Sequence, residues 1–416
     1  MNVYIEVYGC TANKSDASLI RGLLEENNYK IVKKPDEADI IIILTCTVIG
    51  TTEQRMLSRL KNLKEYSKKI IVTGCMASVQ EELLKSIDSN IKILLPQYTA
   101  HIIDIIENKK LPNIPKDKTI FKKTYEDVFA PIAISEGCLF SCTYCITSIA
   151  RGKLRSFPKE GIKKDVSSAV YKGCKEIQIT AQDTSSYGLD TNQNLGELIK
   201  TILTIEGNFK IRIGMMNPYT CLKNLDNIIN SYNDTKIYKF VHLPVQSGDN
   251  EILKKMNRKY NVNDFKSIVK SFRDKYPKIT LSTDIIVGFP GETDAQFNHT
   301  IELLEEIKPD ITNITRFSAR PRTKAKVMKG RIKTDIVKQR SRILTDLCSN
   351  ISKENNEKEI DKNFNILITE KGKKNTYVGR NENYKPVVIK EKVNIGEFIN
   401  VKITKTYPTY LVGSII

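Results

Sequence analysis

A Cys-x3-Cys-x2-Cys pattern, formed by Cys138, Cys142 and Cys145, constrains this chain more than any other feature. Three thiolates spaced in this way can ligate three irons of a four-iron cluster and leave the fourth iron open, because such clusters usually have four cysteine ligands. A zinc site would need a second ligand pair downstream, and neither another Cys-x2-Cys nor a nearby His follows. A disulfide would need an oxidising compartment, whereas the start of the sequence has no secretory pattern. We therefore predict an iron–sulfur loop.

The charge of the chain suggests a polyanionic partner. Its 416 residues carry a formal net charge of +18, with a sequence pI near 9.3. Lys and Arg residues that neutralise phosphates release counterions, so this balance favours nucleic acid, although a composition rich in Lys, Ile and Asn is an alternative explanation. No apolar run approaches the roughly 20 residues that span a bilayer. We expect a cytoplasmic protein without membrane contact.

The first 110 residues are predicted to form a small parallel α/β domain. Three strand-like runs at 3–7, 40–44 and 70–73 alternate with helical patterns at about 15–27 and 52–66. Each run leads almost directly into a cysteine, namely Cys10, Cys46 or Cys75. The carboxyl ends of parallel strands share one edge of a sheet, so these cysteines should converge on a second cluster with only three protein ligands.

The alternative for each of these cysteines is a small buried apolar residue, which is a common environment for free Cys. Three equivalent positions, two of them preceded by Gly, favour a ligand set instead. The remaining cysteines share no such position and are interpreted as packing residues: Cys174, Cys221 and Cys348.

A second domain is predicted over residues 131–350, after a Pro- and Lys-rich linker at about 108–125. Six strand-like runs alternate with helical segments, which indicates a parallel barrel or partial barrel with its working end at the carboxyl ends of the strands: 132–135, 176–180, 211–215, 240–243, 280–287 and 311–317. Polar residues at that rim suit a cofactor with amine, carboxylate, ribose and adenine groups: Gln182, Asp183, Gln246, Ser247 and Asp284. The alternative for each is an ordinary turn or helix start.

Residues 353–416 change character and alternate short β-rich runs with Gly, Asn and Lys turns. This pattern predicts a small antiparallel barrel. Such barrels often bind oligonucleotides, and basic and aromatic residues suit that role: Tyr377, Arg380, Tyr384 and Lys385. The alternative is an appendage that only stabilises the fold.

These features together resemble a known family. The cysteine loop, with an aromatic residue before its last Cys, resembles the radical S-adenosylmethionine (SAM) superfamily. The added three-cysteine domain and the terminal barrel, which resembles the RNA-binding TRAM domain, are similar to the methylthiotransferases. The resemblance covers nearly the whole chain and includes YGCTANKSD at 8–16, ARG at 150–152, QDT at 182–184, HLPVQSG at 242–248 and DIIVGFPGET at 284–293.

Three further stretches resemble the archaeal and eukaryotic branch of that family: GKLRSFP at 152–158, GMMNP at 214–218 and GRNENYKPV at 379–387. This resemblance implies conversion of N6-threonylcarbamoyladenosine at position 37 of tRNA, in the anticodon stem-loop, to its 2-methylthio derivative. Other branches act on isopentenyladenosine in tRNA or on an aspartate of a ribosomal protein. A non-enzymatic iron–sulfur sensor that binds RNA is a rival from another class, whereas a metal-dependent hydrolase fits poorly with only three His residues.

The resemblance implies two [4Fe-4S] clusters and SAM as cofactors, with an electron donor that the sequence does not identify. A radical generated from SAM would remove the hydrogen from adenine C2, because the C2–H bond is too inert for side-chain acid–base chemistry. The sequence leaves the catalytic residues unknown. By the same resemblance, Tyr144 packs near the SAM adenine, and Gln182 and Asp183 contact its amino group. Further candidates for its carboxylate and ribose are Arg212, Gln246, Ser247 and Asp284.

Overall fold

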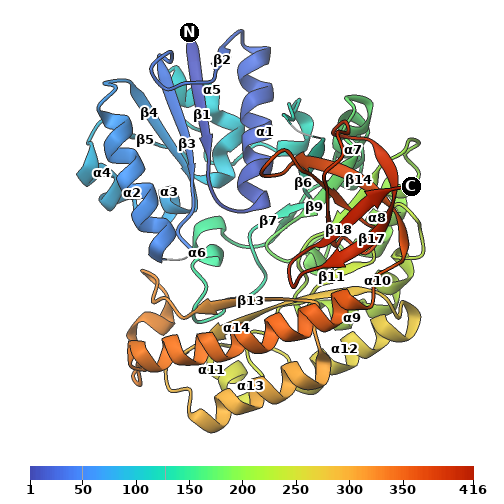
Figure 1. Cartoon of the computed structure of the whole chain (residues 1–416). Coiled ribbons are helices and arrows are strands. Elements are labelled where there is room, and N and C mark those ends of the chain that lie inside the picture. The colour runs from blue at the N-terminus through green and yellow to red at the C-terminus, as the bar shows by residue number, and fades with distance from the viewer. Residues whose placement is uncertain (49, 127) are drawn as a thin grey trace.

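The computed structural model describes residues 1–48, 50–126 and 128–416, which form three parts (Figure 1). The N-terminal part is a five-stranded parallel sheet in the order β2-β1-β3-β4-β5. Its strands are β1 (Asn2–Val7), β2 (Lys30–Val32), β3 (Ile40–Thr45), β4 (Lys69–Gly74) and β5 (Lys92–Ile93). The sequence predicted the three central strands. It missed β2 and β5, which are too short to show the alternating hydrophobic pattern of a strand.

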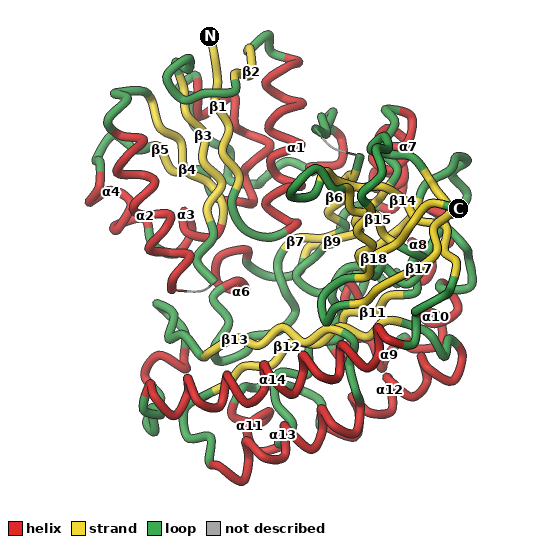
Figure 2. Tube along the Cα trace, viewed as in Figure 1, coloured by secondary structure: helices red, strands yellow, loops and turns green. Residues whose placement is uncertain are grey.

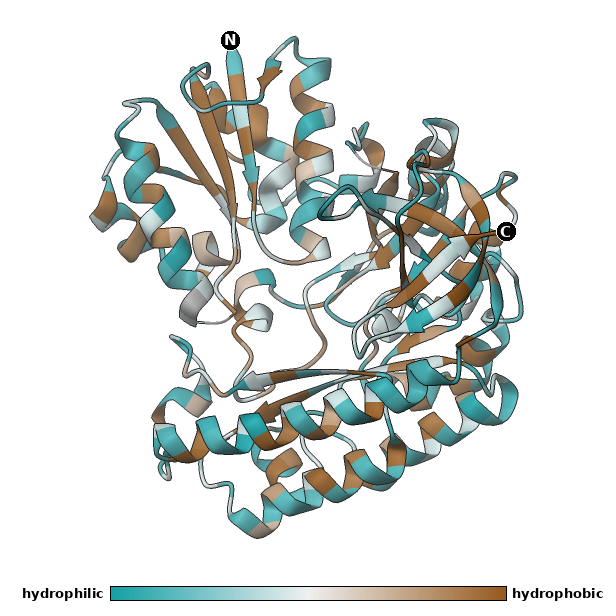
Figure 3. Cartoon of the chain, viewed as in Figure 1, coloured by the Kyte–Doolittle hydropathy of each residue, from teal (hydrophilic) through white to brown (hydrophobic). Residues whose placement is uncertain are grey.

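Helices cover both faces of this sheet, because successive side chains of a buried strand point to opposite sides. All six residues of β3 are buried: Ile40 and Ile42 pack with α1 (Thr11–Glu26) and α5 (Ile102–Ile106), whereas Ile41 and Ile43 pack with α2 (Gly50–Lys64) and α4 (Glu81–Ile87). The strands are accordingly mostly hydrophobic, and the outer faces of the helices are mostly hydrophilic (Figure 3).

The central part is a partial barrel of six parallel strands, as the sequence predicts. Two three-stranded sheets, in the orders β10-β9-β6 and β11-β12-β13, approach one another through the bridge between Ile211 and Ile237. The strands are β6 (Phe129–Ala133), β9 (Glu176–Thr180), β10 (Lys210–Ile213), β11 (Phe240–His242), β12 (Thr280–Val287) and β13 (Ile311–Arg316). The bounds of β9 and β12 agree with the predicted runs.

Helices surround this partial barrel on its outer side (Figure 2). They are α7 (Lys159–Tyr171), α8 (Leu195–Leu203), α9 (Pro218–Lys223), α10 (Leu225–Ser231), α11 (Asn250–Lys255), α12 (Val262–Lys275), α13 (Asp294–Ile307) and α14 (Thr334–Glu357). Their apolar faces share one large core with the strands, and this core contains the three cysteines interpreted as packing residues: Cys174, Cys221 and Cys348. No helix among the described residues is long and apolar enough to cross a membrane.

The C-terminal part is a closed five-stranded barrel in the order β14-β15-β16-β18-β17, with a small buried core of Ile and Val residues. Closure leaves no unpaired edge strand. The pairs are antiparallel as predicted, except that β16 and β18 run parallel. The strands are β14 (Asn363–Lys371), β15 (Tyr377–Arg380), β16 (Pro386–Ile389), β17 (Phe398–Thr406) and β18 (Leu411–Ile415).

Tyr384 docks this barrel onto the amino ends of the central strands. Its hydroxyl donates to Glu176 Oε1 at 2.9 Å, and its ring lies 4.8 Å from that of Tyr238 and 5.1 Å from that of Phe240. The neighbouring Lys385 is 5% exposed and pairs with Asp310 at 3.2 Å. The expectation that Tyr384 and Lys385 contact RNA is therefore wrong, because both side chains are engaged inside the molecule.

The predicted linker is packed against its surroundings and contributes buried charges. Lys118 lies in a short 3-10 helix (Lys118–Ile120) and is 4% exposed, while Lys123 is 5% exposed and pairs with Asp165. Burying a lysine is costly unless a partner compensates its charge. These contacts fix the connection between the N-terminal and central parts.

Candidate functional site

The three N-terminal cysteines gather at one edge of the sheet, as the sequence predicts. Cys10 follows β1, Cys46 follows β3, and Cys75 begins α3 (Cys75–Val79) directly after β4. The three thiols are close enough that a negative charge on Cys10 raises the pKa of Cys46 and Cys75. Burial raises the pKa of Cys46, and it raises the pKa of Cys75 to about 11. A metal that binds here must therefore displace protons, as metal ions do from thiol ligands.

Glycines before two of these cysteines allow the strand ends to come close. Gly9 has φ +97°, and a Cβ there would lie 2.9 Å from Cys46 Cβ. Gly74 has φ +88°, and a Cβ would lie 2.3 Å from the Thr45 carbonyl oxygen. Both conditions exclude a side chain. The close backbone approach brings the three thiols together, which is what a shared cluster requires.

The second triplet lies on the loop between β7 (Ser135–Glu136) and α6 (Thr147–Arg151). The segment after α11 holds this loop: Thr143 N donates to the Met256 carbonyl at 3.1 Å, and Asn257 Nδ2 donates to the Ser141 carbonyl at 3.0 Å. Arg258 Nη1 lies 3.4 Å from Cys142 Sγ. Burial raises the pKa of Cys142, and it raises the pKa of Cys138 to about 12.

The two triplets lie on facing elements. Cys75 and Val79 of α3 form one buried hydrophobic cluster with Ile146 and Ala150, which follow Cys145. A cavity of about 360 Å³ has Val48, two residues after Cys46, in one wall and residues 144–147 in another. Its volume is in the range of ligand pockets. Both cysteine loops therefore border one cavity.

Asp284 and Gln246 form part of a further wall of this cavity, together with Tyr144. Asp284 Oδ1 lies 2.9 Å from His242 Nε2 and accepts from Asn313 Nδ2 at 2.8 Å, so its carboxylate is held in place. Gln246 has φ +73°, and its main chain bonds to β12 through Asp284 O and Ile286 N. Three predicted SAM-binding residues are thus brought together beside Cys145.

The other predicted SAM-binding residues do not line this cavity. Asp183 is 1% exposed, and its carboxylate accepts from Ser185 Oγ at 2.7 Å, Asn217 N at 2.9 Å and Thr220 Oγ1 at 2.6 Å. Its oxygens are therefore occupied by protein donors, although it lies within electrostatic reach of Cys138. The adjacent Gln182 differs, because its buried Oε1 has no hydrogen-bond partner among the residues that the structure describes.

Arg212 and Ser247 are not among the residues that line the cavity. The Arg212 guanidinium lies over the rings of Phe240 and Tyr384, at 5.2 and 5.3 Å from their centroids. Ser247 is 1% exposed, and its Oγ accepts from Asp249 N at 3.2 Å. Contact of either residue with SAM stays a prediction.

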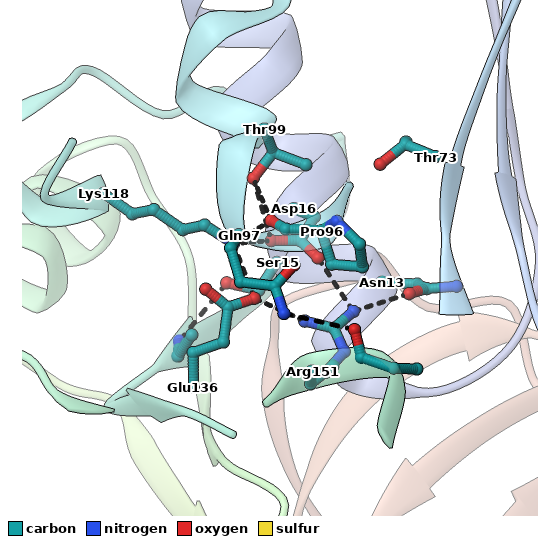
Figure 4. Close-up of polar contacts among 12 residues, drawn as sticks. Asn13, Ser15, Asp16, Thr73, Pro96, Gln97, Thr99, Lys118, Glu136 and Arg151 are labelled. Atoms are coloured by element: carbon teal, nitrogen blue, oxygen red, sulfur yellow. Dashed lines mark hydrogen bonds and ion pairs between the residues drawn. The ribbon is translucent and has the colours of Figure 1, made fainter. Parts of the chain in front are cut away.

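A buried ionic network joins the two cysteine loops (Figure 4). Arg151 donates to Asp16 Oδ2 at 2.9 Å, to Asn13 Oδ1 at 2.8 Å and to Glu136 Oε1 at 3.1 Å. Lys118 completes the network, with Nζ at 2.8 Å from Asp16 Oδ1 and 3.0 Å from Glu136 Oε1. Burial alone would raise the pKa of Asp16, but Lys118 and Arg151 together lower it.

Apart from Lys118, the members of this network lie close to the cysteines in sequence. Asn13 follows Cys10, and its Nδ2 also donates to the carbonyls of Tyr8 and Thr45 at the ends of β1 and β3. Glu136 precedes Cys138, and Arg151 follows Cys145 on α6. Asn13, Asp16 and Arg151 lie within motifs that resemble the family, but the sequence predicted no role for them. It missed Arg258 and Lys118 because no spacing connects them to the cysteines.

The donor sets fit two iron–sulfur clusters. In the described part of the chain, no three His, Cys, Asp or Glu side chains converge to hold a single metal ion. Each cysteine of a four-iron cluster binds a separate iron, so its ligands need not meet at one point. The unpartnered Oε1 of Gln182 fits the ammonium group of SAM, because an ammonium group can only donate hydrogen bonds and this oxygen can accept one.

Comparisons with known proteins agree with this architecture. Residues 132–304 match the radical SAM superfamily, residues 2–96 match the uncharacterized protein family UPF0004, and residues 357–416 match the TRAM domain. Among solved structures, the radical SAM methyltransferase TsrM from Kitasatospora setae has a TM-score of 0.56 at 11% identity, covering 78% of this chain and 76% of that one. The fold and the cysteine loop thus define a radical SAM protein.

Full-length relatives narrow the class. The probable threonylcarbamoyladenosine tRNA methylthiotransferase of Pyrococcus horikoshii is 42% identical over 100% of both chains, and that of Methanocaldococcus jannaschii is 41% identical over 100% of this chain and 97% of its own. The human threonylcarbamoyladenosine tRNA methylthiotransferase is 32% identical over 99% of this chain and 73% of its own. The chain belongs to the radical SAM methylthiotransferase family, in the branch that these archaeal and eukaryotic relatives form.

Proposed function

We propose that this protein is a tRNA methylthiotransferase that converts N6-threonylcarbamoyladenosine at position 37 to its 2-methylthio derivative. The observation that carries the proposal is one cavity lined by Cys145 of one triplet and by Val48, two residues after Cys46 of the other, in a chain 42% identical over its full length to an archaeal relative of that name. The reaction needs a group that activates adenine C2 and a group that supplies sulfur. Two adjacent clusters meet both needs.

Cys138, Cys142 and Cys145 would hold the cluster that binds SAM, and Cys10, Cys46 and Cys75 would hold the second cluster. When bound, the first supplies radical cleavage of SAM, and the second supplies the sulfur. The side chains of the protein would bind and orient SAM. Tyr144, Gln246 and Asp284 would orient SAM in the cavity, and Gln182 Oε1 would accept a hydrogen bond from its amino group.

Exclusion of water is a further contribution of the protein, because a radical must be kept from side reactions. The cavity of about 360 Å³ lies between two packed domains, and apolar side chains such as Val48, Ile146 and Phe317 form part of its lining. The buried network around Arg151 keeps these domains together. It would hold the two triplets at a fixed separation during the transfer.

The anticodon stem-loop is the proposed recognition element of the tRNA, because a base in a single-stranded loop can be turned out into a pocket at lower cost than a paired one. An anionic substrate agrees with the net charge of +18. We also expect the reaction to take place in the cytoplasm, where the tRNA substrate is available.

Mass spectrometry of tRNA nucleosides tests this function. Cells that lack the protein should accumulate threonylcarbamoyladenosine without its 2-methylthio form, and the wild-type gene should restore that form. A variant with Ser at Cys138, Cys142 and Cys145 should not restore it. Persistence of the methylthio nucleoside in the deleted strain, with no second enzyme of this kind encoded, would contradict the proposal.

A further inference from the structure

A basic segment, residues 316–333, runs from the last residue of β13 to the residue before α14. It contains eight Lys or Arg residues and no Asp or Glu. The cations are Arg316, Arg320, Arg322, Lys324, Lys326, Lys329, Arg331 and Lys333. Such a concentration of like charge is unfavourable by itself. It suggests that an anion compensates the segment when the protein works.

Seven of these cations are exposed, and in the ranges that the structure describes none of the seven forms an ion pair. Arg320 is the exception, because it is 5% exposed and pairs with Glu53. One arginine of the basic segment therefore stabilises the fold. The other seven cations are available to a ligand.

Hydrogen bonds of the main chain and of the Arg320 side chain hold the basic segment in place. Arg320 Nη2 donates to Thr47 Oγ1 at 2.8 Å, next to Cys46. Ala325 N donates to the Thr143 carbonyl at 2.8 Å, inside the second cysteine loop. Gly291 N donates to the Gly330 carbonyl at 2.8 Å. The cationic side chains thus extend from a main chain fixed to both cysteine loops, which lowers the entropic cost of binding.

The basic segment also lines two cavities that share part of their wall. Arg316 and Arg331 line a second cavity of about 560 Å³, and residues 315–318 line both this cavity and the one beside the cysteines. A nucleotide whose base enters the inner cavity would leave its flanking phosphates near the outer one. Phosphates are the ligands that exposed Arg and Lys side chains suit best in an RNA.

We infer that the basic segment is an RNA clamp that binds the phosphates flanking the modified nucleotide. The inference rests on the proposed function, because it concerns the same tRNA substrate. It assigns much of the affinity for the RNA phosphates to the central domain, beside the cysteine loops, rather than to the C-terminal barrel alone. Two basic or aromatic residues expected there to contact RNA, Tyr384 and Lys385, are occupied internally.

Binding of an anticodon stem-loop RNA to the anaerobically purified holoenzyme tests the clamp. The variant K324Q/K326Q/K329Q removes three exposed charges, and the control K30Q/K33Q/K34Q removes three exposed charges near β2, at the opposite end of the N-terminal sheet from the cysteines (Figure 1). We expect the clamp variant to bind roughly tenfold or more weakly, and the slope of log Kd against log salt to fall by about 2 to 3. The control should bind like the wild type.

Wild-type affinity and salt slope in the clamp variant, or an equal loss in the control, would overturn the inference. Circular dichroism and iron content should match the wild type in both variants, because every substituted side chain is exposed. Failure of the proposed function has a different readout. In that case the wild-type enzyme would form no methylthio nucleoside on tRNA, whatever its affinity for the stem-loop.

Discussion

Arg151 and Asp16, which are 135 residues apart in the sequence, form a buried ion pair with 2.9 Å between Nη2 and Oδ2. Asp16 lies on the helix that follows Cys10, and Arg151 lies on the helix that follows Cys145. The pair thus connects the two cysteine loops across the domain boundary. Its surroundings satisfy both charges through Lys118, Glu136 and Asn13.

Replacement of Arg151 by Met should destabilise the protein by about 3 to 5 kcal/mol, because it leaves the Asp16 carboxylate buried beside Glu136 with too little positive charge. Calorimetry of anaerobic protein measures this loss. Asp16→Asn should have an effect of similar direction, and the double variant should lose less than the sum because the two side chains interact directly. Lys270→Met, at an exposed ion pair with Asp274, is the control and should change little.

Arg258 should tune the reduction potential of the SAM-binding cluster, because its guanidinium lies 3.4 Å from Cys142 Sγ. Arg258→Met removes a positive charge, so the electron that the cluster gains on reduction is stabilised less. The potential should fall by roughly 60 mV, which is about tenfold in a one-electron equilibrium. A potentiometric titration followed by electron paramagnetic resonance measures it. Arg258→Lys should recover part of the shift, and an unchanged potential in Arg258→Met at full iron content would refute this role.

Gln182 and Asp183 should respond differently to substitution. Gln182→Leu removes the unpartnered Oε1 and should weaken SAM binding about tenfold, the value of one hydrogen bond to a charged group, with little change in stability. Asp183→Asn should instead lower the melting temperature, because the amide has one accepting oxygen where the carboxylate accepts from Ser185 and Asn217 at Oδ1 and from Thr220 at Oδ2. Isothermal titration with SAM and calorimetry separate the two effects. Equal SAM affinity in Gln182→Leu would argue against this contact.

Tyr384 should fix the C-terminal barrel to the central domain. Tyr384→Ala empties the space between Tyr238 and Phe240 and should cost about 3 to 5 kcal/mol. Tyr384→Phe removes only the hydrogen bond to Glu176 and should cost about 1 kcal/mol. Hydrogen exchange at the amides of 381–385 reports whether the barrel detaches. If Tyr384→Ala left exchange there unchanged, the tyrosine would not be the docking residue.

The sequence predicted what depends on local pattern. The bounds of β9 and β12 followed from runs of apolar residues, and the convergence of Cys10, Cys46 and Cys75 followed from the shared edge of parallel strands. It did not predict the contact of Arg151 with Asp16 or that of Arg258 with Cys142, because these contacts join segments 135 and 116 residues apart. Tyr384 was assigned to RNA for a related reason. A tyrosine in a basic loop has the same local pattern whether it stacks on a base or packs against Phe240.

Iron content of two triple variants tests the central claim, which is that each cysteine triplet holds its own cluster at a shared cavity. Ser at Cys10, Cys46 and Cys75 should remove about half of the iron and abolish formation of the methylthio nucleoside, while SAM is still cleaved under strong reductant. Ser at Cys138, Cys142 and Cys145 should remove the other half and abolish SAM cleavage. Full iron content in either variant, purified and reconstituted without oxygen, would contradict the account.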